Sequence, residues 1–311
     1  MGGSGGGYSE WTPKQFESRV RDAEKVSFEA GFAPELSNFL GDLLRQFNSR
    51  DVETVNDRLN ELKEFLSDEL ESSITLQFGG SVAKHTYVDG LSDVDAMFVT
   101  KSADTDFENP NDLVSSFADL ISTKLGDSAE VKSGEMAVSI TYRDGTELQI
   151  LPAAATPDGN LKVSSPDGDN WSKIKPKAFN QILSEVNKAC NYNLVPTIKL
   201  AKAINATLPK QRQLTGYHME SLAVDAFKNY TGTKTKHEML VNFFASAKNQ
   251  VLKPIADRSG QSRHLDDYLG ASGSDERKRA SYLLGRIEKR MRNANAAGSK
   301  TAWGSIFGID D

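Results

Sequence analysis

Several features are scarce in this 311-residue sequence, and each scarcity excludes a class of protein. Cys190 is the one cysteine, which excludes a disulfide framework within the chain, and without an adjacent histidine it is expected to be a buried apolar residue rather than a nucleophile. No apolar run reaches the roughly 18 residues that a membrane-spanning helix needs. Met1 to Gly7 lacks the basic and apolar regions of a signal peptide and is interpreted as a flexible tail. These absences predict a cytoplasmic protein without a membrane partner.

The composition is that of a globular protein that can bury a core, with 38% hydrophobic and 26% charged residues. The length suggests one large or two ordinary domains. A net charge of −6 argues against a general nucleic-acid coat protein, although it is compatible with a local basic cleft.

Periodicity predicts helices over residues 9–72, because apolar residues in 51–70 recur at steps of three and four. These residues are Val52, Val55, Leu59, Leu62, Leu66 and Leu70. The pattern then alternates over residues 74–78 and stops at Gly79-Gly80, which predicts a strand and a turn. A short helix over 81–87, a turn over 88–92 and a strand over 93–100 are expected next.

Further along, we expect a helix over 111–125, strands over 130–142 and 146–151 joined by a hairpin at Arg143-Asp144-Gly145, and a loop over 156–172. Helices are expected over 179–206 (with Pro196 marking a start or kink), 217–230, 237–255 and 275–297. The predicted fold is α+β: a tail (1–8), N-terminal helices (9–72) with a long spine helix, an α/β core (73–175) and a helical domain (176–300).

Two short motifs in the α/β core indicate phosphate and metal chemistry. Glycines at 79 and 80 let the backbone approach a phosphate closely, and Ser81 adds a hydroxyl at the start of a helix. Asp93 and Asp95 are two residues apart on a predicted strand, so both project from one face. Mg²⁺ prefers such oxygen ligands, and two ions between carboxylates can clamp the attacking and leaving oxygens of a phosphoryl transfer. A lone Asp-x-Asp is weak evidence, but the ordered combination of motifs is more specific.

This combination resembles the polymerase-β-type nucleotidyltransferase superfamily, which carries a Gly-Ser turn, an Asp-x-Asp pair and a third carboxylate on a later strand. Residues 194–202 and 214–222 narrow the resemblance to the oligoadenylate synthetases and the cGAS/DncV-like nucleotidyltransferases, over roughly residues 50–290. The resemblance implies a Mg²⁺-dependent (or Mn²⁺-dependent) enzyme with a polymerase-β-like core. Such an enzyme makes short linear or cyclic oligonucleotide signals from nucleoside triphosphates, ATP or dATP among them, often in bacterial anti-phage defence through an effector protein that binds the product.

The resemblance also assigns roles to individual residues. Gly80 and Ser81 match the phosphate-binding turn, and Asp93 and Asp95 match the metal pair. Lys199 and Lys202 match basic helix positions that would touch the triphosphate, against the alternative of a solvated helix face. Tyr217 matches a position that meets the base, against core packing. His218 and Glu220 are interpreted as structural and His85 as a surface histidine.

The third carboxylate departs from the family pattern. Counting back from Pro152, its expected position is Gln149, which cannot accept a proton at neutral pH. Three interpretations stay open: Glu147, on the same strand face, supplies the acid; the site works with two aspartates while Gln149 places the acceptor hydroxyl; or the protein is a catalytically dead nucleotide-binding regulator. A transferase that adds nucleotides to RNA, protein or a small molecule is a further alternative.

Two basic stretches in the C-terminal half are candidates for nucleotide contacts. Arg258, Arg263 and His264 lie in a loop similar to one that covers the nucleotide in the relatives, against the alternative of a loop with its own salt bridges. The helix over 276–292 carries seven Lys or Arg against two Glu, and with Lys173, Lys175 and Lys177 it could hold an oligonucleotide product, although most charged faces are only solvated.

Overall fold

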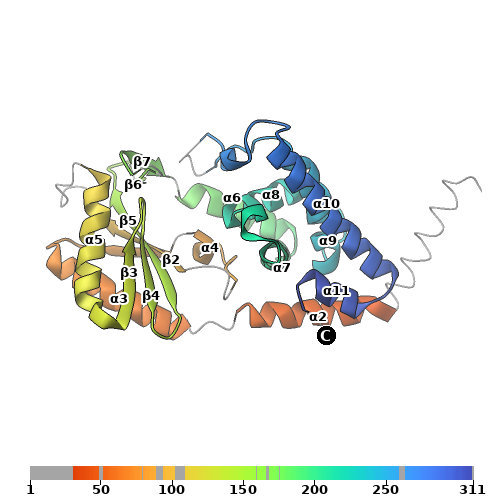
Figure 1. Cartoon of the computed structure of the whole chain (residues 1–311), viewed down its shortest axis with the longest axis horizontal. Coiled ribbons are helices and arrows are strands. Elements are labelled where there is room, and N and C mark those ends of the chain that lie inside the picture. The colour runs from red at the N-terminus through yellow and green to blue at the C-terminus, as the bar shows by residue number, and fades with distance from the viewer. Residues whose placement is uncertain are drawn as a thin grey trace, which may run out of the picture.

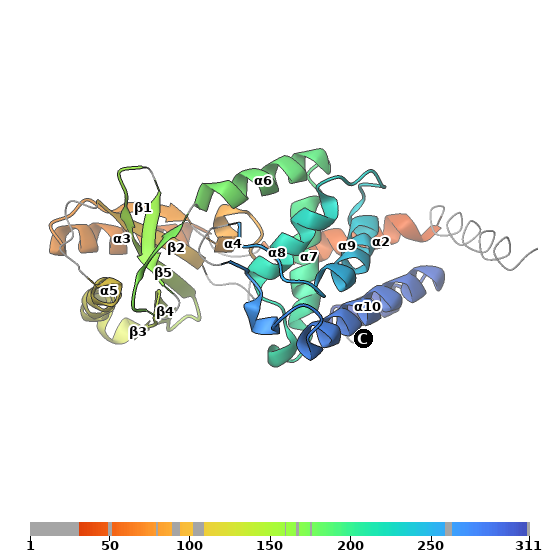
Figure 2. The same ribbon diagram turned by 90° about the horizontal axis from the view of Figure 1, so that it is seen from above.

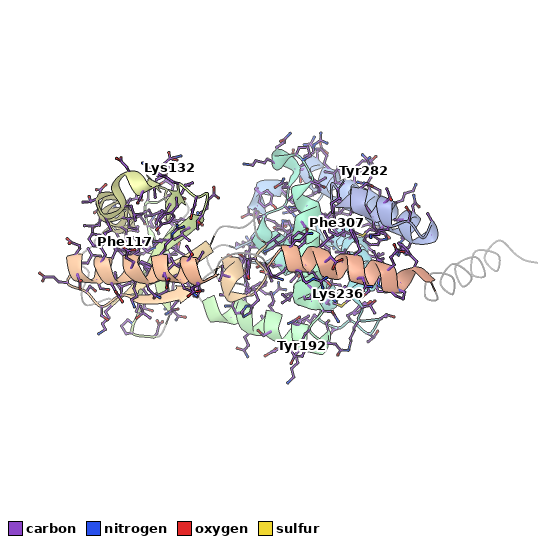
Figure 3. All side chains as sticks on the ribbon, turned by 90° about the horizontal axis from the view of Figure 1, so that it is seen from below. Phe117, Lys132, Tyr192, Lys236, Tyr282 and Phe307 are labelled. Carbon is purple, nitrogen blue, oxygen red and sulfur yellow. The ribbon has the colours of Figure 1, made fainter. Side chains whose placement is uncertain are left out.

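Two consecutive helices, α2 (Ala33–Gln46) and α3 (Val52–Glu69), pack on two different hydrophobic cores. The computed structural model describes residues 31–48, 52–78, 80–88, 94–101, 109–158, 160–165, 168–174, 176–258 and 263–309. α2 buries leucines at 36, 40 and 43 against the C-terminal helices, and α3 buries leucines at 59, 62 and 66 against a sheet. The two helices lie one after the other along the same side of the molecule (Figure 3). The predicted helical region is therefore two helices within the described residues, and each belongs to a separate lobe.

The sheet lobe contains residues 52–174 and is built on a seven-stranded sheet (Figure 1). Its strands are β1 (Thr75–Phe78), β2 (Val94–Thr100), β3 (Ala129–Ser133), β4 (Val138–Tyr142), β5 (Glu147–Ala155), β6 (Leu161–Ser164) and β7 (Trp171–Ile174). The order is β1-β2-β5-β4-β3, with β6 paired to β5 and β7 to β6. β2 and β5 run parallel, and the other neighbouring strands run antiparallel. The short helix α4 (Gly80–Ala83) follows β1, and α5 (Pro110–Leu125) follows β2.

The two faces of the sheet have different neighbours, because side chains alternate along each strand. Even-numbered residues of β2 and β5, including Phe98 and Ile150, pack with α3 and α5 in one core. Odd-numbered residues of the same strands, including Met97 and Ala153, pack with Val163 of β6 in a second, smaller core. Gln149 occupies an odd position of β5 and therefore belongs to the face opposite α3 and α5.

Two strand predictions for this lobe are wrong. Residues 130–142 are two strands, because the chain turns where the Gly134 N–H donates to the Ala137 carbonyl (2.8 Å). Residues 156–172, expected to be a loop, contain β6 and the start of β7, whose short alternating pattern is masked by Pro, Gly and Asp. The hairpin between β4 and β5 is confirmed, with Gly145 at φ 84° donating its N–H to the Tyr142 carbonyl (2.9 Å).

The helical lobe combines α2 with residues 176–309 (Figures 1 and 2). Its further helices are α6 (Pro176–Ala189), α7 (Leu194–Ala206), α8 (Gly216–Phe227), α9 (Lys236–Gln250), α10 (Asp275–Ala296) and α11 (Lys300–Ile306). The helix predicted over 179–206 is two helices, because Asn191 and Tyr192 take positive φ values of 53° and 60° at the break. Burial of Cys190 is confirmed, and this burial raises the pKa of its thiol. No helix in the described ranges is long and apolar enough to cross a membrane.

Candidate active site

The Gly-Ser turn lies where β1 ends and α4 begins, between the two lobes (Figure 1). Gly80 has φ 48°, in a region that glycine enters without steric cost, and Gly79 lies outside the described residues. Ser81 is buried, and its carbonyl accepts a hydrogen bond from the Thr86 N–H (2.9 Å). This bond folds residues 81–86 back into a compact turn, so the predicted helix over 81–87 is a single turn followed by a bend.

The parallel pairing of β2 and β5 decides which residue lies beside Asp95, a predicted metal ligand. In this register Asp95 pairs with Gln149, and Ser139 of β4 pairs with Gln149 from the other side. Adjacent strands are about 4.8 Å apart, so Gln149 is the direct cross-strand neighbour of Asp95. Glu147 lies two residues earlier on β5, about 7 Å along the strand, and is exposed. The residue that the count from Pro152 selects, Gln149, therefore lies beside Asp95, and its role as the third ligand position stays a prediction.

The donors at this edge of the sheet suit a hard divalent cation, but the acids are few. Among the residues that the structure describes, no group of three or more His, Cys, Asp or Glu is placed to hold a metal ion. Asp93, the other half of the predicted pair, lies outside those residues. The carboxylate of Asp95 and the amide oxygen of Gln149 are both oxygen donors of the kind that such cations accept. A metal here would therefore depend on Asp93 and Asp95, with an amide in place of the third acid.

Lys199 and Lys202 of α7 share a helix face, as their spacing predicts, and both contact the segment that follows the Gly-Ser turn. Lys202 Nζ donates to the Thr86 carbonyl (3.1 Å) and Oγ1 (3.4 Å), and to Glu220 Oε1 of α8 (2.7 Å). Lys199 Nζ lies 4.1 Å from the centre of the Tyr87 ring and donates to Asn48 Oδ1.

Both lysine side chains are buried rather than solvated, at 5% and 8% exposure for Lys199 and Lys202. The three contacts of Lys202 match the three donors of an ammonium group. Contact of Lys202 with a triphosphate stays a prediction, and it would require the exchange of one of these hydrogen bonds.

Glu220 is the centre of a buried polar cluster that joins the lobes. Its Oε2 lies 2.6 Å from Lys84 Nζ, and its Oε1 accepts from Lys202 and from the Thr86 hydroxyl. Burial alone would raise the pKa of the Glu220 carboxyl, but the ammonium groups of Lys202 and Lys84 outweigh burial and hold that pKa below its ordinary value. Lys84 and Thr86 were missed by sequence reasoning, because no spacing rule connects residues 84, 86, 202 and 220.

Tyr217 at the start of α8 is packed in the helical lobe and keeps some exposure. Its hydroxyl donates to Asp257 Oδ1 (3.0 Å), and its ring meets Phe179 edge-on with centroids 5.0 Å apart. Lys84 Nζ lies 5.2 Å from the centre of the Tyr217 ring, so this tyrosine borders the Glu220 cluster. These contacts support the core-packing alternative, and contact with a base stays a prediction.

His218 is buried, as its interpretation as a structural residue requires, whereas His85 is exposed. The Nδ1 of His218 lies 2.7 Å from the Tyr268 hydroxyl, and its Nε2 lies 3.7 Å from Asp266 Oδ2. Asp266 in turn accepts from the fully buried Arg277 (2.7 Å). Burial, the main cause, lowers the pKa of His218 from 6.5 to about 4, so the folded protein holds this imidazole neutral at pH 7.

The loop that follows α9 has its own salt bridges in its described part. Arg258 pairs with Asp225 of α8 (2.6 Å), and His264 lies 3.2 Å from Asp267. Four residues between them, 259–262, lie outside the described residues. The prediction that this loop covers the nucleotide depends partly on those residues. The contacts favour the loop as a structural element and leave a phosphate contact by Arg263 as a prediction.

The basic helix α10 has most of its charges already paired. Arg277 is buried, Lys278 and Arg279 pair with Asp275 and Glu276, and Arg292 pairs with Glu288. Lys173 pairs with Asp158, and the side chains of Lys175 and Lys177 lie outside the described set. Three of the seven basic residues, Arg286, Lys289 and Arg290, are not among these pairs, and a product-binding face on α10 stays a prediction.

A mixed sheet with a Gly-Ser turn between its first two strands, an Asp-bearing strand and a helical lobe define a nucleotidyltransferase-type α+β fold. A family model, the Second Messenger Oligonucleotide or Dinucleotide Synthetase (SMODS) domain, matches residues 32–187, half of the chain. The chain belongs to this family.

Several solved structures of bacterial proteins share the fold. CdnC of E. coli MS115-1 with ATP is 17% identical, with a TM-score of 0.65 over 83% of this chain and 91% of that chain. CdnG of Bradyrhizobium diazoefficiens with GTP is 13% identical, with a TM-score of 0.64 over 82% and 90%. Vibrio cholerae DncV, a cyclic AMP-GMP synthase solved with a linear intermediate, is 12% identical, with a TM-score of 0.61 over 95% and 88%. At these identities the likeness shows the fold alone.

One curated relative matches at the level of sequence. It is a probable cyclic nucleotide synthase of Bacillus cereus (strain VD146), 24% identical over 168 residues, which are 52% of this chain and 50% of the relative. The match therefore spans about half the length of that relative.

Proposed function

We propose that this protein is a metal-dependent nucleotidyltransferase that makes a short linear or cyclic oligonucleotide signal from nucleoside triphosphates, in bacterial anti-phage defence. The observation that carries this proposal is the register of β2 and β5, which pairs Asp95 with Gln149, the residue predicted at the third ligand position. The chain belongs to the SMODS family and has a Gly-Ser turn before this strand pair, and both facts support nucleotidyl transfer. A cytoplasmic location, as the sequence predicts, would give the enzyme its triphosphates.

The reaction joins the acceptor hydroxyl oxygen to the α-phosphorus of a triphosphate, and pyrophosphate leaves. Mg²⁺ or Mn²⁺ held by Asp93 and Asp95 would supply the positive charge that neutralises the triphosphate and makes the hydroxyl more acidic. The backbone at Gly80 and Ser81 contacts the phosphates of the donor. Gln149 donates and accepts hydrogen bonds, so it orients the acceptor hydroxyl beside Asp95 without taking its proton. The proton passes to Glu147 or, if Glu147 does not reach it, to water or a substrate phosphate.

A second candidate function is a nucleotide-binding regulator without catalysis, and the glutamine at position 149 is the observation that favours it. The count from Pro152 assigns this amide to the position where the pattern of the superfamily has an acid, and such a site would have one negative charge fewer for the metals. Transfer of nucleotides to RNA is disfavoured by the net charge of −6 and by the internal pairing of the basic residues on α10.

Incubation with radiolabelled ATP, dATP and the other triphosphates, with Mg²⁺ or Mn²⁺ and with excess EDTA, tests the proposal. We expect an oligonucleotide product with either metal, none with EDTA, and a loss of at least about a hundredfold in Asp95→Asn. Glu147→Gln and Gln149→Ala in parallel identify the group that serves the third position. Nucleotide binding without product under both metals would establish the regulator instead, and full turnover by Asp95→Asn would refute the site.

A further inference from the structure

The two lobes have separate hydrophobic cores, and a cluster of four polar side chains, three of them buried and Lys84 partly buried, joins them. Lys84 and Thr86 come from the segment after α4 in the sheet lobe, Lys202 from α7 and Glu220 from α8. Glu220 is 1% exposed and Thr86 is fully buried. A carboxylate removed from water in this way destabilises the folded protein unless its cationic partners stay within contact distance. The cluster therefore requires the two lobes to keep their relative position.

The charges of the cluster make Glu220 its central member. Two ammonium groups, of Lys84 and Lys202, lie within 2.6 and 2.7 Å of one carboxylate, which leaves one excess positive charge at the junction. Loss of the carboxylate charge would leave two buried cations facing each other, and like charges at this range repel strongly away from water. The lobes would then separate at this point, because the two lysines come from different lobes.

The segment that this cluster holds connects the two motifs of the proposed active site. Residues 84–88 follow the Gly80-Ser81 turn and lead to β2, which carries Asp95. Lys199 of α7 contacts Tyr87 in the same segment. The helical lobe therefore contacts the segment between the proposed phosphate-binding turn and the proposed metal-binding strand. A shift of α7 or α8 would move that segment.

We infer that Glu220 is a positioning residue: it fixes the helical lobe on residues 84–86 and so sets the Gly80-Ser81 turn relative to Asp95. The catalytic part of this inference rests on the proposed function, whereas its structural part does not. A misplacement of about 1 Å of a positioned group can cost about a hundredfold in rate, so a remote carboxylate can control turnover without touching substrate.

The distance between the lobes tests the structural part directly. Spin labels at Lys132→Cys on β3 and Tyr282→Cys on α10 report on different lobes (Figure 3), and the natural Cys190 is 1% exposed and does not compete for label. We expect a narrow distance distribution, measured by pulsed electron paramagnetic resonance, with Glu220 intact. In Glu220→Gln, which keeps the shape and loses the charge, the distribution should broaden and shift to longer distances.

Glu288→Gln is the matched control, because Glu288 is also a buried carboxylate between two cations, Lys248 (2.7 Å) and Arg292 (2.6 Å). All three of these residues belong to the helical lobe, so this variant should leave the distribution between the lobes unchanged. If Glu220→Gln does not fold, Lys84→Met keeps the Lys202–Glu220 pair and should give a smaller broadening in the same direction.

Steady-state kinetics test the catalytic part. In Glu220→Gln we expect kcat to fall at least tenfold while the KM for the triphosphate changes less than threefold, with partial recovery of kcat in Glu220→Asp. Glu288→Gln should keep the kcat of the parent protein. Unchanged distances and kcat in Glu220→Gln would overturn the inference. If the parent protein makes no product, the proposed function fails on its own, and the distances still decide whether Glu220 positions the lobes.

Discussion

Acidification from pH 7 to pH 4 should destabilise the helical lobe through one buried side chain, His218. Its pKa in the folded protein is about 4, against an ordinary value of 6.5, mainly because burial disfavours the imidazolium. Between these pH values the unfolded chain binds a proton at this histidine and the folded chain does not. The free energy of unfolding therefore falls as the pH falls through this window and changes no further from this group below about pH 4.

The magnitude follows from the distance between the two pKa values. One pH unit corresponds to about 1.4 kcal/mol, so the gap from 6.5 to about 4 corresponds to a loss of about 3 kcal/mol. Asp266 remains charged beside the imidazole in this window. Burial would raise the pKa of Asp266, but hydrogen bonding from Arg277 and a backbone N–H outweighs burial and holds that pKa below its ordinary value. This carboxylate limits the penalty for His218 and does not cancel it.

Urea denaturation of the parent protein and of His218→Asn at several pH values between 4 and 7 measures this effect. Asparagine does not titrate, and its amide oxygen can still accept from the Tyr268 hydroxyl. The difference in unfolding free energy between the two proteins should change by about 3 kcal/mol across the range, in favour of the variant at low pH. His85→Asn is the control, because His85 is exposed at φ 56°, which asparagine also adopts. If the parent and His218→Asn lost stability in parallel, the buried neutral histidine would not be the cause.

Three further predictions concern stability and reactivity. Arg277→Met should lower the free energy of unfolding by about 3–5 kcal/mol, because the buried Asp266 would lose its cation. Arg279→Met, on the exposed face, should change the free energy of unfolding by less than about 0.5 kcal/mol. Thermal denaturation of both variants tests this difference. Gly145→Ala, at φ 84°, should destabilise the hairpin by about 1 kcal/mol. Gly41→Ala, within α2 and with open space around its Cβ position, should stabilise the protein by up to about 1 kcal/mol. The opposite sign for either variant would contradict the backbone argument. Cys190 should react with a thiol reagent only after denaturation, and rapid labelling of the native protein would be inconsistent with its burial.

Local patterns in the sequence were sufficient to predict a helix or strand wherever its own residues show a clear periodicity. The recurrence of apolar residues at steps of three and four in residues 52–69 predicted α3, and the alternation of apolar and polar residues before Gly79 predicted β1. The count from Pro152 follows the pattern of the superfamily and selects Gln149. The pairing of β2 with β5 puts this residue beside Asp95, and its role as a ligand position stays a prediction. The strand break at Gly134 was not predictable in the same way, since a single glycine is compatible with both a continuous and a broken strand.

By itself, the sequence determined most of the order of the elements, the Gly-Ser turn after the first strand and the strand that carries Asp95. Only the tertiary structure decided what the basic residues contact. Lys199 and Lys202, expected on a triphosphate, are buried against Tyr87, Thr86 and Glu220. The partner of a charged side chain depends on which elements approach it in space, and residues 84, 202 and 220 meet only when the two lobes come together. No periodicity along the chain encodes that meeting, because the interaction energy depends on distances between lobes rather than on neighbours in sequence.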